Sequence, residues 1–171
     1  MIIGRLRGEV AAVGLDHLLI DVGGVGYVAL AGTRLLAKLQ TGDAITAHIE
    51  TRVTESSITL FAFATDEERA WFVRLQDVPG VAGKSALAIL DGLSPVEIMD
   101  AIALGDAGAF TRAKGIGKKL GERIVTELAG KAPPLGRFGK FEVAAVAGLA
   151  SARPEGVTGS RAEAVSALVN L

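Results

Sequence analysis

The residues best suited to chemistry in this sequence are lysines that follow glycine-rich turns. Residues 78–90 (VPGVAGKSALAIL) are echoed 35 positions later by residues 113–125 (AKGIGKKLGERIV). In each copy a glycine–aliphatic–small turn precedes a basic residue at the start of a predicted helix. Glycine permits positive φ and close backbone approach, and the free N–H groups at a helix start attract anions. The repeat therefore predicts two sites for phosphate groups.

Both turns fit the helix-hairpin-helix pattern, which contacts the DNA backbone without reading base sequence. A lysine in the first helical turn is unfavourable because its charge opposes the helix dipole. The presence of Lys84, Lys118 and Lys119 at these positions therefore favours an anion-binding site. Val81 and Ile116 are expected to point inward and anchor the turns. The candidate DNA-binding residues are Gly80, Val81, Ala82, Gly83, Lys84, Gly115, Ile116, Gly117, Lys118, Lys119 and Arg123.

Charge distribution supports local rather than general binding of a polyanion. The chain has 18 Lys and Arg against 19 Asp and Glu, a net charge of −1. That balance excludes a protein that is basic throughout. Residues 112–123 nevertheless hold five basic side chains and one acidic one. A single copy of the turn is equally compatible with an ordinary αα-hairpin, but two tandem copies with basic residues favour DNA binding.

Several other kinds of site are excluded. With no cysteine there is no thiol nucleophile or Cys-based zinc site, and His17 and His48 are expected to be structural or surface residues. The phrase around Lys84 lacks the earlier glycine of a Walker A loop, because position 78 is Val, and no strand is predicted before it. No nucleophile–base arrangement occurs. We therefore expect no catalytic residues, no metal and no cofactor.

The chain is expected to be a soluble cytoplasmic protein without a membrane segment. Its N-terminus, MIIGRLRGEVAAV, is too short and too often interrupted by charge for a signal peptide. No run of about 18 uninterrupted apolar residues occurs.

The elements that must position the turns form an α+β arrangement. Residues 1–64 carry Val-, Ile- and Thr-rich runs separated by turn residues, with Gly23-Gly24 suited to a two-residue hairpin. One or two helical turns are expected within residues 33–39. This pattern predicts a five-stranded barrel of the OB type. The predicted strands are residues 2–13, 17–22, 25–30, 44–53 and 57–63.

From Thr65 the apolar spacing becomes helical, and residues 65–132 are predicted to form the all-α tandem helix-hairpin-helix domain. Trp71 and Phe72 are expected in the core of its first helix. Later helices are predicted at residues 84–93, 96–104, 107–113 and 118–128. Residues 133–158 have the composition of a flexible linker. Residues 159–171 are predicted to begin a C-terminal helical domain of which this sequence holds only the first helix.

Four short segments, in the same order along the chain, resemble the RuvA family, the Holliday-junction-binding subunits of a bacterial branch-migration machine. The likeness runs from residue 1 to about residue 128 and resumes at 163–168. It is carried by GRLRG (4–8), DVGGVGY (21–27), LAIL (87–90) and GIGKK (115–119).

The resemblance implies a non-catalytic subunit that acts in recombination, DNA repair and the SOS response to DNA damage. The barrel would assemble a homotetramer, or an octamer, and two hairpins per subunit would hold the arms of a four-way junction. An acidic pin between the fourth and fifth strands maps to Glu55 and Ser56, with Arg52 a further candidate nearby. The implied partners are the hexameric ATPase RuvB, docked by the C-terminal domain, and the junction resolvase RuvC.

This sequence departs from the family pattern at several positions. Ser56 stands where the pin usually has a second carboxylate, which halves its charge. Ala82 replaces the second glycine of the first turn, and Gly83 is expected to take over the unusual φ. Lys114 and Gly121 stand where proline and alanine are common. Two other functions stay open: a general OB and helix-hairpin-helix repair accessory factor without junction preference, and a structural assembly protein whose hairpins are only packing turns.

Overall fold

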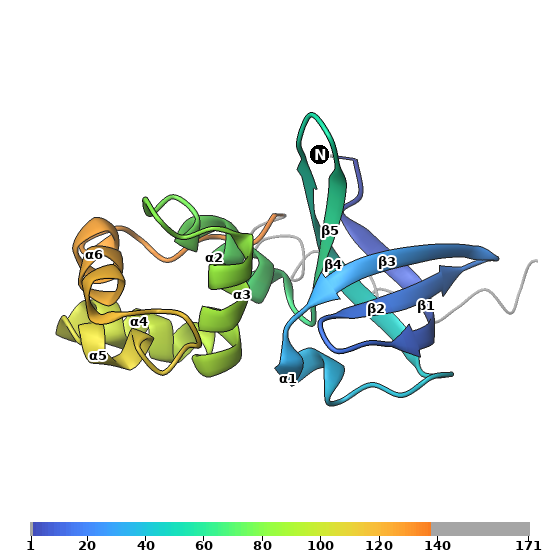
Figure 1. The fold of residues 1–171 in the computed structure, drawn as a ribbon, viewed down its shortest axis with the longest axis horizontal. Helices are drawn as coiled ribbons and strands as arrows, with labels where there is room; N and C mark the ends of the chain where they lie inside the picture. The colour runs from blue at the N-terminus through green and yellow to red at the C-terminus, as the bar shows by residue number, and fades with distance from the viewer. Residues whose placement is uncertain (1, 138–171) are drawn as a thin grey trace, which may run out of the picture. The chain divides into compact units, whose positions relative to one another are not determined.

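The computed structural model describes residues 2–137. The C-terminal helix predicted at residues 159–171, and the linker from residue 138 onward, lie outside the described residues. Within the described part, the chain forms a β-barrel followed by short helices (Figure 1). The α+β fold class is confirmed for this part of the chain.

Five strands close into a barrel, as predicted, and their order is β1-β2-β3-β5-β4. Strands β3 and β5 pair in parallel, and every other neighbouring pair is antiparallel. The β2–β3 turn uses Gly23 and Gly24 at φ 64° and 90°, the left-handed backbone that a two-residue hairpin of this kind needs. The bounds are β1 Arg5–Val13, β2 His17–Val22, β3 Val25–Ala31, α1 Thr33–Leu36, β4 Ala44–Val53 and β5 Ile58–Phe63.

The barrel interior is filled by alternate side chains of its strands. Val10, Leu18, Ile20 and Ile49 are completely buried, because residues two apart on a strand point to the same face. The first strand begins at Arg5 rather than Ile2, whose side chain is 78% exposed. An exposed Ile2 contributes nothing to this core. The strand is therefore shorter than the one predicted from the apolar N-terminal residues.

The helical part has its own core, which extends onto the barrel. Trp71 and Phe72 are buried in it, as predicted, and two phenylalanines of β5 join them. The Phe72 ring centroid lies 4.7 Å from that of Phe61 and 4.9 Å from that of Phe63. The helix bounds are α2 Asp66–Leu75, α3 Gly83–Gly92, α4 Pro95–Leu104, α5 Ala107–Phe110 and α6 Lys118–Leu128.

A carboxylate from α3 caps the short helix α1 of the barrel. Asp91 accepts hydrogen bonds from the backbone N–H groups of Thr33 and Arg34, at 3.0 and 3.2 Å. Arg34 in turn donates to the carbonyl oxygen of Leu90. A Cβ at Gly32 would lie 2.3 Å from an Asp91 oxygen, so a side chain there would displace the carboxylate from the cap. The cap therefore joins α3 to the barrel.

A partly buried charge cluster makes a second connection. Arg69 of α2 donates to Asp66 and, at 3.0 Å, to Glu50 of β4. Arg137 donates to the same Glu50 at 3.1 Å and to two barrel carbonyl oxygens at 2.9 and 3.0 Å. Burial alone would raise the pKa of Asp66, but hydrogen bonds from Arg69 and the Arg137 backbone outweigh it and lower that pKa. The charges of Arg69 and Arg137 are thus balanced by Asp66 and Glu50 where α2, β4 and the segment after α6 meet.

Among residues 2–137, no helix is both long enough and apolar enough to cross a membrane.

Candidate nucleic-acid interface

The two predicted turns have the same backbone geometry. Gly80 and Gly115 each take positive φ, 94° and 84°. In both turns the next residue, Val81 or Ile116, donates its N–H to the carbonyl oxygen three residues earlier, at 3.0 and 3.1 Å. Both of these side chains are buried in the helical core, as predicted. They anchor the turns, and their N–H groups are already used within the protein.

The expectation that Gly83 supplies the unusual φ is wrong, because Gly83 is the first residue of α3 and does not have positive φ. Ala82 is the residue before α3 and has extended backbone, φ −93° and ψ 174°; its counterpart Gly117 before α6 is nearly the same, φ −87° and ψ 168°. Neither position needs glycine, so Ala82 fits without strain. Gly83 serves packing instead, since a Cβ there would lie 3.0 Å from the Phe61 ring.

The helices that follow the two turns begin without a capping side chain. Three other helices have a side-chain cap: Thr65 caps α2, Ser94 caps α4 in a reciprocal arrangement with Glu97, and Asp106 caps α5. Helices α3 and α6 have neither a side-chain cap nor an acidic residue in the first turn. Their first N–H groups are therefore open to an external acceptor.

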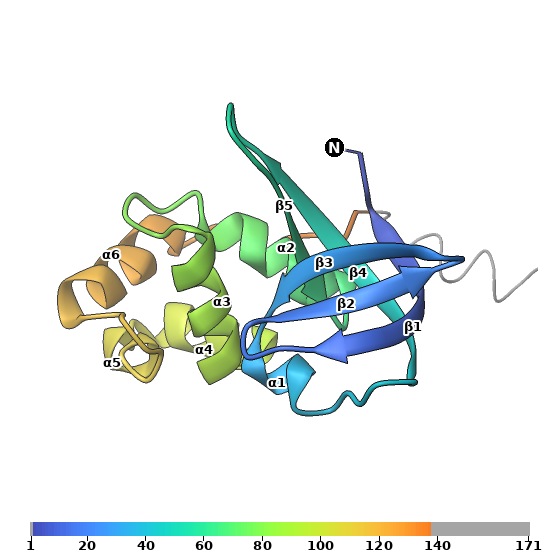
Figure 2. The ribbon, with the colours of Figure 1, turned by 45° about the vertical axis from the view of Figure 1, so that its right-hand side comes forward.

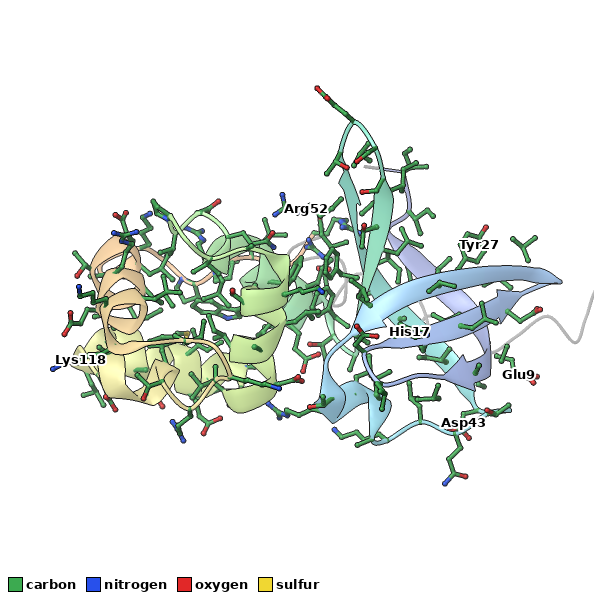
Figure 3. All side chains as sticks on the ribbon, in the orientation of Figure 1. Glu9, His17, Tyr27, Asp43, Arg52 and Lys118 are labelled. Atoms are coloured by element: carbon green, nitrogen blue, oxygen red, sulfur yellow. The ribbon has the colours of Figure 1, made fainter. Side chains whose placement is uncertain are left out.

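The open donors lie next to the lysines. Eight backbone N–H groups in and after the turns have no hydrogen-bond acceptor within residues 2–137. They belong to Gly80, Ala82, Gly83, Lys84, Gly115, Gly117, Lys118 and Lys119. All three lysine side chains are exposed. Lys118 is 85% exposed and projects outward (Figure 3); its Nζ lies 4.0 Å from Glu122, a surface pair that holds it only weakly.

Arg123 lies differently from the lysines. Its Nη1 donates to the carbonyl oxygen of Pro79, 3.2 Å away, in the first turn. A Cβ built on Gly80 would lie 3.4 Å from Leu120, which shows that the first turn packs against α6. Arg123 therefore brings the second hairpin and the first turn together, with guanidinium donors left over for another acceptor.

The predicted pin is the tip of the β4–β5 hairpin, which extends beyond the rest of the barrel in both views (Figures 1 and 2). Thr54 and Ser57 close the tip: the Thr54 N–H donates to the Ser57 carbonyl at 2.8 Å, and their hydroxyls are 2.8 Å apart. Glu55 and Ser56 lie between them and are exposed. The tip carries one carboxylate, well separated in sequence from the basic turns.

The described residues offer little for metal or nucleotide chemistry. No group of three or more His, Asp or Glu side chains that could hold a metal occurs within residues 2–137. The Gly83-Lys84-Ser85 phrase follows a helix and a turn, not a strand, so it lacks the Walker A setting. A cavity of about 280 Å³ beside Trp71, Met99 and Leu128 is lined mainly by apolar groups. The open N–H groups and exposed lysines instead suit the binding of an extended anion.

Comparisons with known proteins agree with this arrangement. The family model "RuvA N terminal domain" matches residues 1–62, and "SAM-like Helix-hairpin-helix tandem" matches residues 72–129. The Holliday junction branch migration complex subunit RuvA of Maricaulis maris (strain MCS10) is 48% identical over 181 residues, covering 99% of this chain and 82% of that protein. Proteins of the same name from Sinorhizobium medicae (strain WSM419) and Azorhizobium caulinodans are 47% and 46% identical, with the same coverage.

Proposed function

The chain belongs to the RuvA family, and on that premise we propose that it binds four-way DNA junctions by their shape. Its relatives are named as subunits of the Holliday junction branch migration complex. The observation that carries the proposal in this chain is the pair of uncapped helix starts, each with open N–H groups and lysine in the first turn. These are the groups that a DNA phosphate needs.

Each turn would hold one stretch of backbone. The N–H groups around Gly80–Gly83 and Gly115–Gly117 donate to phosphate oxygens, and Lys84, Lys118 and Lys119 neutralise the charge. Arg123 contributes its free guanidinium donors. Because no base-reading side chain is required, recognition depends on the position of the phosphates, not on sequence.

Junction preference would come from assembly. Four subunits around one junction present eight turns, so modest contacts at each sum to tight binding only where four arms are available. The barrel is the proposed assembly domain, residues 1–64, and residues 65–132 the DNA-binding domain. Exposed apolar side chains on the barrel, including Leu15, Val25 and Val28, offer surface that neighbouring subunits can cover.

The pin would act at the centre of the junction. Four copies of Glu55 place negative charge where the strands cross, which repels phosphates and keeps the strands apart. Ser56 contributes no charge, so the centre is less negative than with two carboxylates per subunit. Balanced overall charge suits this task, since phosphates are attracted at the turns and repelled elsewhere.

In this proposal the chain is a non-catalytic subunit and works in the cytoplasm in recombination and repair. ATP hydrolysis belongs to a partner motor of the RuvB type, and a resolvase of the RuvC type is a further partner. The support for these partners is family membership alone.

A binding competition tests the proposal. Labelled four-way junction and linear duplex of the same sequence are titrated with the protein at equal salt. We expect the junction to bind about a hundredfold more tightly, a typical gain from multivalent contact. Equal affinities would indicate a general repair accessory factor. Absence of binding to either DNA at low salt would indicate a structural assembly protein.

A further inference from the structure

A hydrogen bond connects the stem of the pin to the end of α2. Arg52 of β4 donates from Nη2 to Oε1 of Gln76, at 2.6 Å. Gln76 is oriented by a second bond, from its Nε2 to the carbonyl oxygen of Phe72 at 2.8 Å. Arg52 leaves the hairpin on the side that faces the helices (Figure 3). The donor is charged and the acceptor is held by its own second bond, while the pair itself is exposed to solvent.

This bond is the outer of two that fasten α2 along β4. The inner one is the buried ion pair of Arg69 with Glu50, at 3.0 Å. Glu50 and Arg52 are two apart on the strand. Gln76 follows Arg69 by seven residues and is the C-cap of α2 with helical backbone, so each pair shares one face. Together with the packing of Phe72 against Phe61 and Phe63, these two bonds hold α2 along the barrel.

The outer bond lies between the two DNA-facing features. Three residues beyond Arg52 is the pin residue Glu55, and four residues beyond Gln76 is the turn glycine Gly80. The strand pair beyond Arg52 has no other described hydrogen bond to the helices. It is therefore the polar contact that holds the base of the pin to the segment just before the first turn.

We propose that Arg52 and Gln76 are positioning residues that set the acidic pin at a fixed distance from the first DNA-binding turn. The inference rests on the proposed function, since it explains how the pin stays in register with phosphates held by the turn. A pin that moves relative to the turns would still repel phosphate, but it would no longer select the geometry of a four-way junction. The effect is therefore on preference for junctions more than on affinity for DNA.

The absence of cysteine from the chain allows a direct distance measurement. Spin labels are placed on Ser56→Cys and Asp77→Cys, both exposed, and labelled chains are diluted with unlabelled ones so that one assembly carries one pair. We expect a narrow distribution of distances between the labels. Gln76→Met should broaden it, and Gln76→Glu should keep it narrow because a carboxylate still accepts from Arg52. Gln40→Met is the matched control, since Gln40 is exposed and remote from the pin.

The two Gln76 variants and Gln40→Met are then compared in DNA binding. We expect Gln76→Met to lower the ratio of junction to duplex affinity by about three- to tenfold, with Gln76→Glu and Gln40→Met at the wild-type ratio. An unchanged width and an unchanged ratio in Gln76→Met would overturn the inference. If the wild-type protein shows no junction preference, the proposed function fails instead, and the label distances still decide whether the bond fixes the pin.

Discussion

Arg123 of α6 donates a hydrogen bond to the carbonyl oxygen of Pro79, 44 residues earlier in the chain and in the other hairpin. This bond and the contact of Leu120 with Gly80 connect the first turn to the helix that follows the second. Arg123 thus has a structural partner in addition to its proposed phosphate.

Replacing Arg123 should therefore affect both folding and binding. We expect Arg123→Met to lower the free energy of unfolding by about 1 kcal/mol, the usual net value of one hydrogen bond, and to weaken junction binding. Lys119→Met removes one positive charge without such a contact and should weaken binding alone. Urea unfolding and junction titrations of both variants would test this. Equal stability of the two variants would contradict the structural role of Arg123.

The lysines at the start of α6 should determine how binding responds to salt. In Lys118→Ala/Lys119→Ala the plot of log affinity against log salt should become shallower by about 0.9 for each phosphate that is no longer neutralised. Lys38→Ala, an exposed lysine on the barrel side, serves as the control. A slope equal to wild type in the double variant would remove these lysines from the phosphate site.

The two glycines of the second turn should respond in opposite ways to alanine. Gly115 has φ 84°, where a side chain costs about 1–2 kcal/mol, so Gly115→Ala should lose about that much stability. Gly117 has φ −87°, and a Cβ added there would meet no atom within 4 Å, so Gly117→Ala should fold as well as wild type. Thermal unfolding of the two variants distinguishes them. Destabilisation by Gly117→Ala would show that position 117 does not tolerate a side chain as position 82 does.

Local rules were enough to predict the backbone geometry of the two turns. Gly80 and Gly115 stand where a turn demands positive φ, and Val81 and Ile116 stand where the turn needs an apolar anchor. These are requirements of a few consecutive residues, so they are visible in the sequence. The role of Gly83 could not be predicted in this way, because it depends on contact with Phe61 of the barrel. Only the folded chain brings that ring close to Gly83.

The contacts that join the barrel to the helices were not predicted. Asp91 caps a helix 58 residues earlier, and Arg137 reaches a barrel carbonyl 133 residues earlier. Neither residue has a periodic pattern or a neighbouring partner that would mark it. Arg52 stands out in the sequence only for its closeness to Glu55, whereas its partner Gln76 lies at the end of α2. Long-range polar pairs of this kind give no signal in a single sequence.

Gly121 in the middle of α6 should resist replacement by alanine. Helix propensity alone would favour alanine by about 1 kcal/mol. A Cβ at this position would lie 2.6 Å from the carbonyl oxygen of Ala107, a backbone atom that cannot move aside easily. We expect the clash to dominate and Gly121→Ala to lose about 1–3 kcal/mol. A variant more stable than wild type would show that α5 shifts to make room.

Acid should weaken the protein partly through Asp66. Hydrogen bonds from Arg69 and the Arg137 backbone, with His48 Nδ1 3.9 Å away, hold the pKa of Asp66 below its ordinary value despite burial. A carboxyl whose pKa is lower in the folded state binds its proton more readily when unfolded. Its stabilisation is therefore complete above the unfolded pKa of about 3.9 and is lost as the pH falls through the folded pKa.

Asp66→Asn should remove that dependence. We expect the variant to be less stable than wild type by about 2 kcal/mol at pH 7, since it loses hydrogen bonds to a charged group. The difference should shrink as the pH falls below about 4, where wild-type Asp66 itself becomes protonated. Urea unfolding between pH 7 and pH 3 measures it, with the exposed neighbour Glu67→Gln as control. A difference that stays constant across this range would mean that another group, and not the Asp66 carboxylate, supplies the acid sensitivity.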